Sequence, residues 1–140
     1  MRASFSAIVR GLPNSPVLRT PMLDSPAARF AVDAVREAAT LTRRVQAEMV
    51  TDALTKGDKS PVTVGDFAAQ AVVGKRLWEA EGVACRVLVG EESADSLRTP
   101  DGAATLEQVT HFVQTLYPDA TPDRVCEWID VGGADAEGAY

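Results

Sequence analysis

Three carboxylates and a lysine lie near the ends of predicted elements, and they are the residues of this chain best suited to chemistry. Asp66 opens an amphipathic helix, and Glu91 and Glu92 follow a short apolar strand, with Glu91 25 residues after Asp66. Lys56 stands ten residues before Asp66. Carboxylate oxygens are the ligands that a hard divalent cation prefers, and such a cation can hold a phosphate ester. The pattern therefore indicates a cation-dependent site for phosphate chemistry.

Asp66 has two compatible interpretations. Thr63-x-x-Asp66 fits a capping box, in which the acidic side chain satisfies the first unpaired amides of a helix. Helix caps are far commoner than catalytic acids, so the cap is the simpler explanation. A carboxylate exposed at a helix N-terminus, at the mouth of a cleft, could also accept a proton from a hydroxyl group or a water molecule. Asp66 is therefore both a candidate cap and a candidate catalytic base.

Glu91 and Glu92 form an adjacent acidic pair, which alone means little. Twenty acidic residues among 140 would produce about three such pairs by chance. The position is more informative, because successive side chains of a strand point to opposite faces, so one glutamate can face a cleft while the other faces away. Gly90 removes side-chain bulk where a ligand would approach the backbone. A polar turn after a buried strand remains the alternative.

Lys56 and Lys59 flank Gly57-Asp58 shortly before the helix that carries Asp66. A lysine near a carboxylate cluster could attract a phosphate group as a mobile point charge. An ordinary exposed turn would have the same composition. Lys56 is therefore a candidate for the vicinity of the phosphate, and this pattern alone does not separate the two readings.

The pattern of apolar residues predicts an α/β chain of the α+β kind, with a long N-terminal helix, short strands and further helices. Ser25-Pro26 supplies an N-cap and a proline at the first helical position. Apolar residues then recur at steps of three and four from Phe30 to Met49. This spacing predicts a helix over about 26–50.

The rest of the chain reads as short strands and further helices. The stretch Ala53–Thr63 contains a glycine and a proline and predicts one or two short strands around a turn. Trp78 and Trp128 fall at inward helical positions, so we expect both to be packed. The remaining expected elements are helices over 63–82, 105–117 and 122–129, a short buried strand over 86–89, and a loop or frayed end over 130–140.

Composition favours one soluble domain over 25–140. The chain is 46% hydrophobic and 24% charged, which is ordinary for a globular protein. A net charge of -6 argues against a broad contact with nucleic acid. No apolar run approaches the ~20 residues that cross a bilayer, and two cysteines are too few for a disulfide framework or a zinc cluster. We therefore expect a cytoplasmic protein with no membrane or nucleic acid partner.

Residues 1–24 form a separate N-terminal segment. Arg2, Arg10 and Arg19 occur there among several serines and threonines, and residues 1–23 contain no acid. This composition is typical of an organellar transit peptide, and it equally fits a disordered extension. An organellar location is therefore the alternative to the cytoplasm.

Two stretches resemble a known family of enzymes. They are Leu54-Thr-Lys-Gly-Asp-Lys-Ser-Pro-Val-Thr-Val-Gly-Asp-Phe-Ala-Ala-Gln70 and Val87-Leu-Val-Gly-Glu-Glu-Ser93. Together they resemble the magnesium-dependent, lithium-sensitive phosphatases of the inositol monophosphatase superfamily, most closely the 3'(2'),5'-bisphosphate nucleotidases. The resemblance covers about 26–95. It implies the N-terminal portion of a layered α-β-α phosphatase fold, with 96–140 as a variable stretch.

The resemblance implies a role for each candidate residue. In that family the first glutamate of Gly-Glu-Glu binds the metal, so Glu91 takes that role and Glu92 supports it. The aspartate after Ser-Pro-Val-Thr helps to activate the attacking water, so Asp66 takes the catalytic role. Lys56 would lie near the metal and the phosphate. The implied reaction is hydrolysis of the 3'-phosphate of adenosine 3',5'-bisphosphate to AMP and phosphate, with Mg²⁺ as cofactor.

Two later motifs of the family, Asp-Pro-Ile-Asp-Gly-Thr and Trp-Asp-x-x-Ala-Gly, do not occur in these 140 residues. We therefore expect a phosphatase domain that is incomplete at its C-terminus, binds Mg²⁺ weakly and is inactive alone. It would associate with a C-terminal half or another chain. The alternatives are a fragment of an inositol- or sugar-phosphate phosphatase, a non-catalytic interaction protein derived from the enzyme half, and an incomplete gene product.

Overall fold

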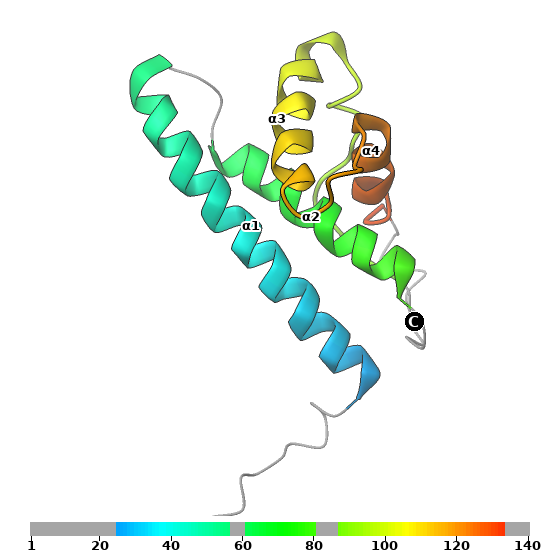
Figure 1. Cartoon of the computed structure of the whole chain (residues 1–140). Coiled ribbons are helices and arrows are strands. Elements are labelled where there is room, and N and C mark those ends of the chain that lie inside the picture. The colour runs from blue at the N-terminus through cyan, green and yellow to red at the C-terminus, as the bar shows by residue number, and fades with distance from the viewer. Residues whose placement is uncertain (1–24, 57–60, 81–86, 134–140) are drawn as a thin grey trace, which may run out of the picture.

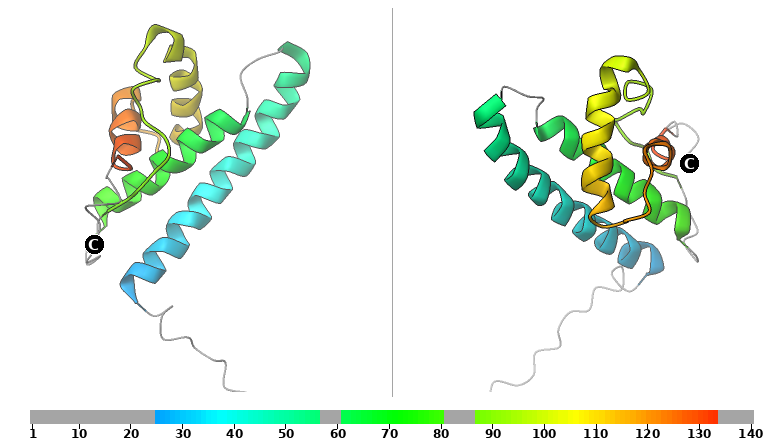
Figure 2. Two further views of the ribbon diagram at one scale, coloured as in Figure 1. Left: turned by 180° about the vertical axis from the view of Figure 1, so that it is seen from behind. Right: turned by 45° about the horizontal axis from the view of Figure 1, so that its top comes forward.

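The computed structural model describes residues 25–56, 61–80 and 87–133, with the side chains at 50–56 and 61 left out of the description. Helices dominate this part of the chain. They are α1 (Pro26–Lys56), α2 (Pro61–Glu79), the short 3-10 helix η2 (Pro100–Gly102), α3 (Ala103–Gln114) and α4 (Pro122–Asp130). Figures 1 and 2 show α2 between α1 on one side and α3 with α4 on the other. Helix α2 contacts each of the other three α-helices and is the centre of the bundle.

Helix α1 forms where the apolar spacing predicts it and continues beyond that prediction to Lys56. Its start is capped by Ser25, whose Oγ accepts a hydrogen bond from the amide of Ala28 at 3.1 Å. The buried stripe of α1 faces α2 and consists of Ala34, Ala38, Leu41, Val45 and Met49. The predicted helix is therefore confirmed, and residues 53–56, predicted to be strand, belong to its last turns.

Helix α2 begins earlier than the sequence suggests. Pro61, interpreted as a strand breaker, is the first residue of the helix, where its missing N–H and fixed φ cost nothing. Its buried side includes Val64, Phe67, Ala71 and Val72, as the spacing predicts. The strand expected up to Thr63 is therefore wrong for residues 61–63.

Trp78 lies on the surface with 66% of its area exposed, so the expectation that it packs inward is wrong. The rotation of α2 is set at Gly74, where an added Cβ would overlap the backbone carbonyl of Trp128 on α4. With α2 held in that orientation, Leu77 takes the inward position and Trp78 is turned about 100° away from it.

Two helical starts in the C-terminal part, those of η2 and α4, follow local rules. Thr99 caps η2 by accepting a hydrogen bond from Gly102, and α3 continues from η2 without a break. Thr121 caps α4 by accepting from the amide of Arg124, with Pro122 at the first helical position. The predicted helices over 105–117 and 122–129 are thus confirmed with small shifts at their ends.

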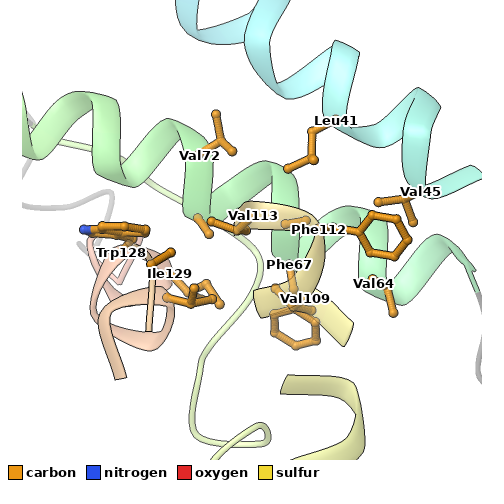
Figure 3. Close-up of a cluster of buried hydrophobic side chains, with 14 of the residues drawn as sticks. Leu41, Val45, Val64, Phe67, Val72, Val109, Phe112, Val113, Trp128 and Ile129 are labelled. Atoms are coloured by element: carbon orange, nitrogen blue, oxygen red, sulfur yellow. The ribbon is translucent and has the colours of Figure 1, made fainter. Parts of the chain in front are cut away.

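The core lies where α2 meets the other three helices. Figure 3 shows Leu41 and Val45 of α1 facing Val72 and Val64 of α2, with side chains of α3 and α4 closing the cluster. Trp128 packs into it with 8% exposure, as the sequence predicts. The largest fully buried side chains in the described ranges are Leu41, Val45, Val64, Val72, Val109, Val113, Val125 and Ile129.

A half-buried polar cluster joins the helices on one side of the core. Arg76 of α2 lies 3.5 Å from the carboxylate of Glu37 on α1. The ammonium group of Lys75 lies 4.1 Å from the ring centre of Tyr117 and also faces Trp128. Burial, together with the neighbouring Glu37, raises the pKa of the Tyr117 phenol. The Tyr117 ring thus lies among charged and aromatic side chains of neighbouring helices, and this cluster contributes to the packing of the bundle.

The described residues contain the predicted helices but no extended strand. Between Val87 and Gly133 the sole β feature in the described ranges is an isolated antiparallel bridge between Val89 and Gly133. Val87 and Val89 are 40% and 56% exposed, so the expectation of a buried strand is wrong for these two residues. Among the described residues Val89 pairs with Gly133, and Val87 is in no bridge. In the described ranges no helix has the length and apolar character needed to span a bilayer.

Candidate active site

Asp66 projects from the second turn of α2 and is exposed. Because the helix starts at Pro61, Thr63 is its third residue and cannot be its N-cap. The predicted capping box of Thr63 and Asp66 is therefore wrong. Within the described residues the Asp66 carboxylate forms no ion pair, which leaves its oxygens available to a proton or a cation.

Glu91 and Glu92 follow the Val89 bridge, with a bend of the chain at Glu91. Glu91 is exposed, whereas Glu92 is half-buried. The stretch is held at its start by a hydrogen bond of 2.8 Å from the amide of Gly90 to the carbonyl of Gly132. The acidic pair therefore follows an anchored residue, and its two side chains differ in burial although neither residue belongs to a strand.

Gln70 ties this acidic segment to α2. Its Nε2 donates to the carbonyl oxygen of Glu92 at 2.7 Å, and its Oε1 accepts from the Glu92 amide at 3.1 Å. The same Nε2 donates to the carbonyl of Ile129 in α4 at 2.8 Å. One side chain thus joins α2, the acidic segment and the end of α4.

The position of Gln70 relates Asp66 to the two glutamates. Residues four apart on an α-helix lie on the same face, about 6 Å apart along the axis. Gln70 is four residues after Asp66, so the backbone of Glu92 is bonded one helical turn from Asp66. The structure therefore brings the acidic segment and Asp66 to neighbouring positions on α2.

Two glycines leave room for the Gln70 carboxamide. A Cβ on Gly90 would overlap it, and a Cβ on Gly132 would come within 2.6 Å of its Nε2. Any side chain at either position would push the amide out of its hydrogen bonds. The role of Gly90 thus differs from the sequence interpretation: its open space is occupied by Gln70.

The donor set near Glu91 suits a hard cation but is small. Glu91 and Glu92 form no ion pair with another described residue, so their oxygens are unclaimed there. Across the described ranges no group of three or more potential metal-binding side chains comes together. Lys56 ends α1, but its side chain lies outside the described residues, as does Lys59. The described residues thus offer two adjacent carboxylates as candidate ligands, which is fewer than a cation site usually requires.

Asp130 is engaged in structure. Its Oδ1 accepts from the amide of Ala94 at 3.2 Å, and its Oδ2 accepts from Arg98 at 2.6 Å. The hydrogen bond to Asp130 raises the pKa of the Arg98 guanidinium. These contacts hold the turn after the acidic segment against the end of α4.

A cavity of about 810 Å³ lies elsewhere, between η2, α3 and α4. Arg98, Thr110, His111 and Cys126 are among its lining residues, which include neither Asp66 nor the acidic pair. Cys126 is a buried free thiol whose pKa is raised by burial. The cavity thus shares no candidate catalytic residue with the site on α2.

Sequence reasoning missed Gln70 and Gly132 as parts of the site. Gln70 was visible in the Phe-x-x-Gln that follows Asp66. Its partners lie 22 and 59 positions away in the sequence, so nothing local indicates the contact.

Comparison with curated proteins finds several relatives that are named as 3'(2'),5'-bisphosphate nucleotidases. The chain is 41% identical over 98 residues to the "3'(2'),5'-bisphosphate nucleotidase" of Schizosaccharomyces pombe, covering 66% of this chain and 27% of that protein. It is 38% identical over 87 residues to "3'(2'),5'-bisphosphate nucleotidase 1" of Arabidopsis thaliana, covering 59% and 25%. It is 35% identical over 91 residues to the "3'(2'),5'-bisphosphate nucleotidase" of Oryza sativa, covering 63% and 25%. The chain thus spans about a quarter of the length of these relatives. No family model and no solved structure matches.

Proposed function

We propose that this chain, which belongs to the 3'(2'),5'-bisphosphate nucleotidase family, provides part of the active site of a phosphatase that converts adenosine 3',5'-bisphosphate to AMP and phosphate. The names of the relatives support the reaction. The observation that carries the proposal is the pair of hydrogen bonds between Gln70 and the backbone of Glu92, one helical turn from Asp66.

In this proposal Glu91 would hold Mg²⁺, and Glu92 would support it. Both are oxygen donors of the kind that Mg²⁺ prefers, and neither is paired with another described residue. When bound, the cation would supply electrostatic stabilisation of the phosphoryl oxygens and acidify a water molecule. The fit is partial, because Mg²⁺ takes about six oxygen ligands and no group of three or more candidate ligands comes together among the described residues.

Asp66 would accept the proton of the attacking water. Its exposure and its place one turn from the Gln70 contact leave the carboxylate accessible from the side of the acidic segment. Lys56 would attract the phosphate as a point charge. We expect the 140 residues alone to turn over little substrate, because a weakly held cation would stabilise the reaction poorly.

A chimera tests the function without requiring activity from the short chain. The matched segment of the Schizosaccharomyces pombe relative would be replaced by the corresponding residues of this chain. The purified chimera would be assayed for phosphate release from adenosine 3',5'-bisphosphate, inositol phosphate and a sugar phosphate in Mg²⁺. We expect the nucleotide to be the preferred substrate.

Single variants of the chimera assign the residues. Asp66→Asn should lower kcat by about 10²- to 10⁴-fold, as loss of a general base does. Glu91→Gln should raise the Mg²⁺ concentration required for half-maximal rate. Glu107→Gln, which alters an exposed glutamate on α3, is the matched control and should change neither. A folded chimera that prefers inositol phosphate, or one whose rate is insensitive to Asp66→Asn, would contradict the proposal.

A further inference from the structure

The hydrogen bonds of Gln70 fix an orientation as well as a distance. A carboxamide has two N–H donors and one carbonyl acceptor. Here the donors serve the carbonyls of Glu92 and Ile129, and the acceptor serves the Glu92 amide. Because both backbone groups of Glu92 are bonded to one planar group, the residue can neither slide along α2 nor rotate away from it without breaking a bond.

We propose that Gln70 is a positioning residue of the phosphatase site: its carboxamide holds the Gly90–Glu92 backbone on α2 and thereby sets the two glutamates against Asp66. The inference rests on the proposed function, since it assigns the contact a purpose in that site. Gln70 itself touches no reacting group in this scheme. It acts through the backbone that carries Glu92 and its neighbour Glu91.

The chemistry of the contact favours glutamine over every similar side chain. Glutamate could accept from the Glu92 amide but could not donate to the two carbonyls, and its charge would repel them. Methionine has nearly the same length and no amide, so it would leave these backbone groups unpaired. Asparagine is one methylene shorter. Gly90 and Gly132 preserve the space that the amide occupies.

The first test measures whether the Gln70 side chain protects the backbone amide of Glu92. Hydrogen exchange of the Glu92 amide would be followed by NMR in the full 140-residue chain and in Gln70→Met. We expect exchange to become about 10- to 100-fold faster, as loss of a hydrogen bond to a half-buried amide implies. Gln114→Met is the matched control, because Gln114 also donates to a backbone carbonyl, that of Ala120 at 2.8 Å, away from the acidic segment.

The second test measures the geometry of the carboxylates with Mn²⁺ as a paramagnetic probe. In the unaltered chain, broadening of the Asp66 amide signal should rise in parallel with that of Glu91. In Gln70→Met, the amide signal of Glu91 should still broaden, whereas the broadening of the Asp66 signal should fall several-fold. Loss of overall stability alone would not change this ratio in a variant whose spectrum shows the folded state.

Gly90→Ala disturbs the same contact by changing the acidic segment instead of Gln70. This variant replaces Gln70→Met in both tests if Gln70→Met does not fold. Its methyl group would displace the carboxamide, so the same faster exchange at Glu92 is expected. Unchanged exchange and an unchanged broadening ratio in a folded variant would overturn the positioning role. If Mn²⁺ broadens neither residue in the unaltered chain, the proposed cation site fails, and the exchange of Glu92 alone decides the role of Gln70.

Discussion

Replacing Gly74 by alanine should destabilise the bundle, whereas the same change at Gly65 should stabilise it. Both glycines are buried residues of α2, so both gain the helix propensity of alanine, about 0.8–1.0 kcal/mol. At Gly65 the new methyl carbon would lie 3.9 Å from Cγ2 of Thr42, an ordinary contact. At Gly74 it would overlap the carbonyl of Trp128 and approach Cβ of Val131 at 3.3 Å.

The difference between the two variants isolates the close approach of α2 and α4. The propensity gain is common to both, so it cancels. Overpacking costs about 1–3 kcal/mol, and the upper end applies here because the obstructing atoms are backbone and cannot rotate away. We therefore expect Gly74→Ala to be less stable than Gly65→Ala by about 2–3 kcal/mol.

Urea unfolding followed by far-UV circular dichroism measures this difference directly. Gly65→Ala should raise the transition midpoint and Gly74→Ala should lower it, with similar m-values. Equal stabilisation by the two substitutions would show that α2 and α4 do not meet at Gly74. The rotation of α2 that places Gln70 over Glu92 would then be wrong as well.

Other perturbations test the core and the buried ionisable groups. Ile129→Ala should cost about 2–5 kcal/mol in the free energy of unfolding, because Ile129 is fully buried, whereas Trp78→Ala should change it by less than about 0.5 kcal/mol. Denaturant titration of both variants checks this, and a large loss at Trp78 would contradict its exposure. Burial raises the pKa of Cys126 and Tyr117 in the folded chain. The contribution of these two groups to the free energy of unfolding is therefore complete below about pH 8.5, the ordinary pKa of a thiol. It declines as pH rises from there toward the raised pKa values of the folded chain. The urea midpoint should therefore fall between neutral and alkaline pH, and less so in Cys126→Ala; an unchanged fall would exclude the thiol as a cause. Cys126 should also react slowly with a thiol reagent until urea unfolds the chain, and rapid labelling of the native protein at this residue would refute its burial.

The parts of the fold that the sequence predicts are those fixed by local rules. Ser25 caps α1 and Thr121 caps α4, and both helices follow from a cap, a proline and the apolar spacing. Helix α2 shows how one local rule misleads. A proline can interrupt a strand or a helix, and it can also be the first residue of a helix. Pro61 is the first residue of α2, so its interpretation as a strand breaker is wrong.

The features that sequence reasoning missed depend on distant partners. The surface position of Trp78 follows from the contact of Gly74 with α4, more than 50 residues away. The strand over 86–89 required a neighbour to pair with, and only Gly133 meets Val89 among the described residues. The candidate carboxylates were found because their types are distinctive, whereas Gln70 was not, because a glutamine has no chemistry that distinguishes it before its contacts are known.

The most direct test of the central claim is a manganese titration of the unaltered chain and of Glu91→Gln, followed by NMR. If Asp66 lies beside a cation that Glu91 holds, the amide signals of Asp66, Glu91 and Glu92 will broaden together, and Glu91→Gln will remove the effect at Asp66. If the Asp66 signal stays sharp while the glutamates broaden, or if it broadens equally in Glu91→Gln, these carboxylates do not form one site.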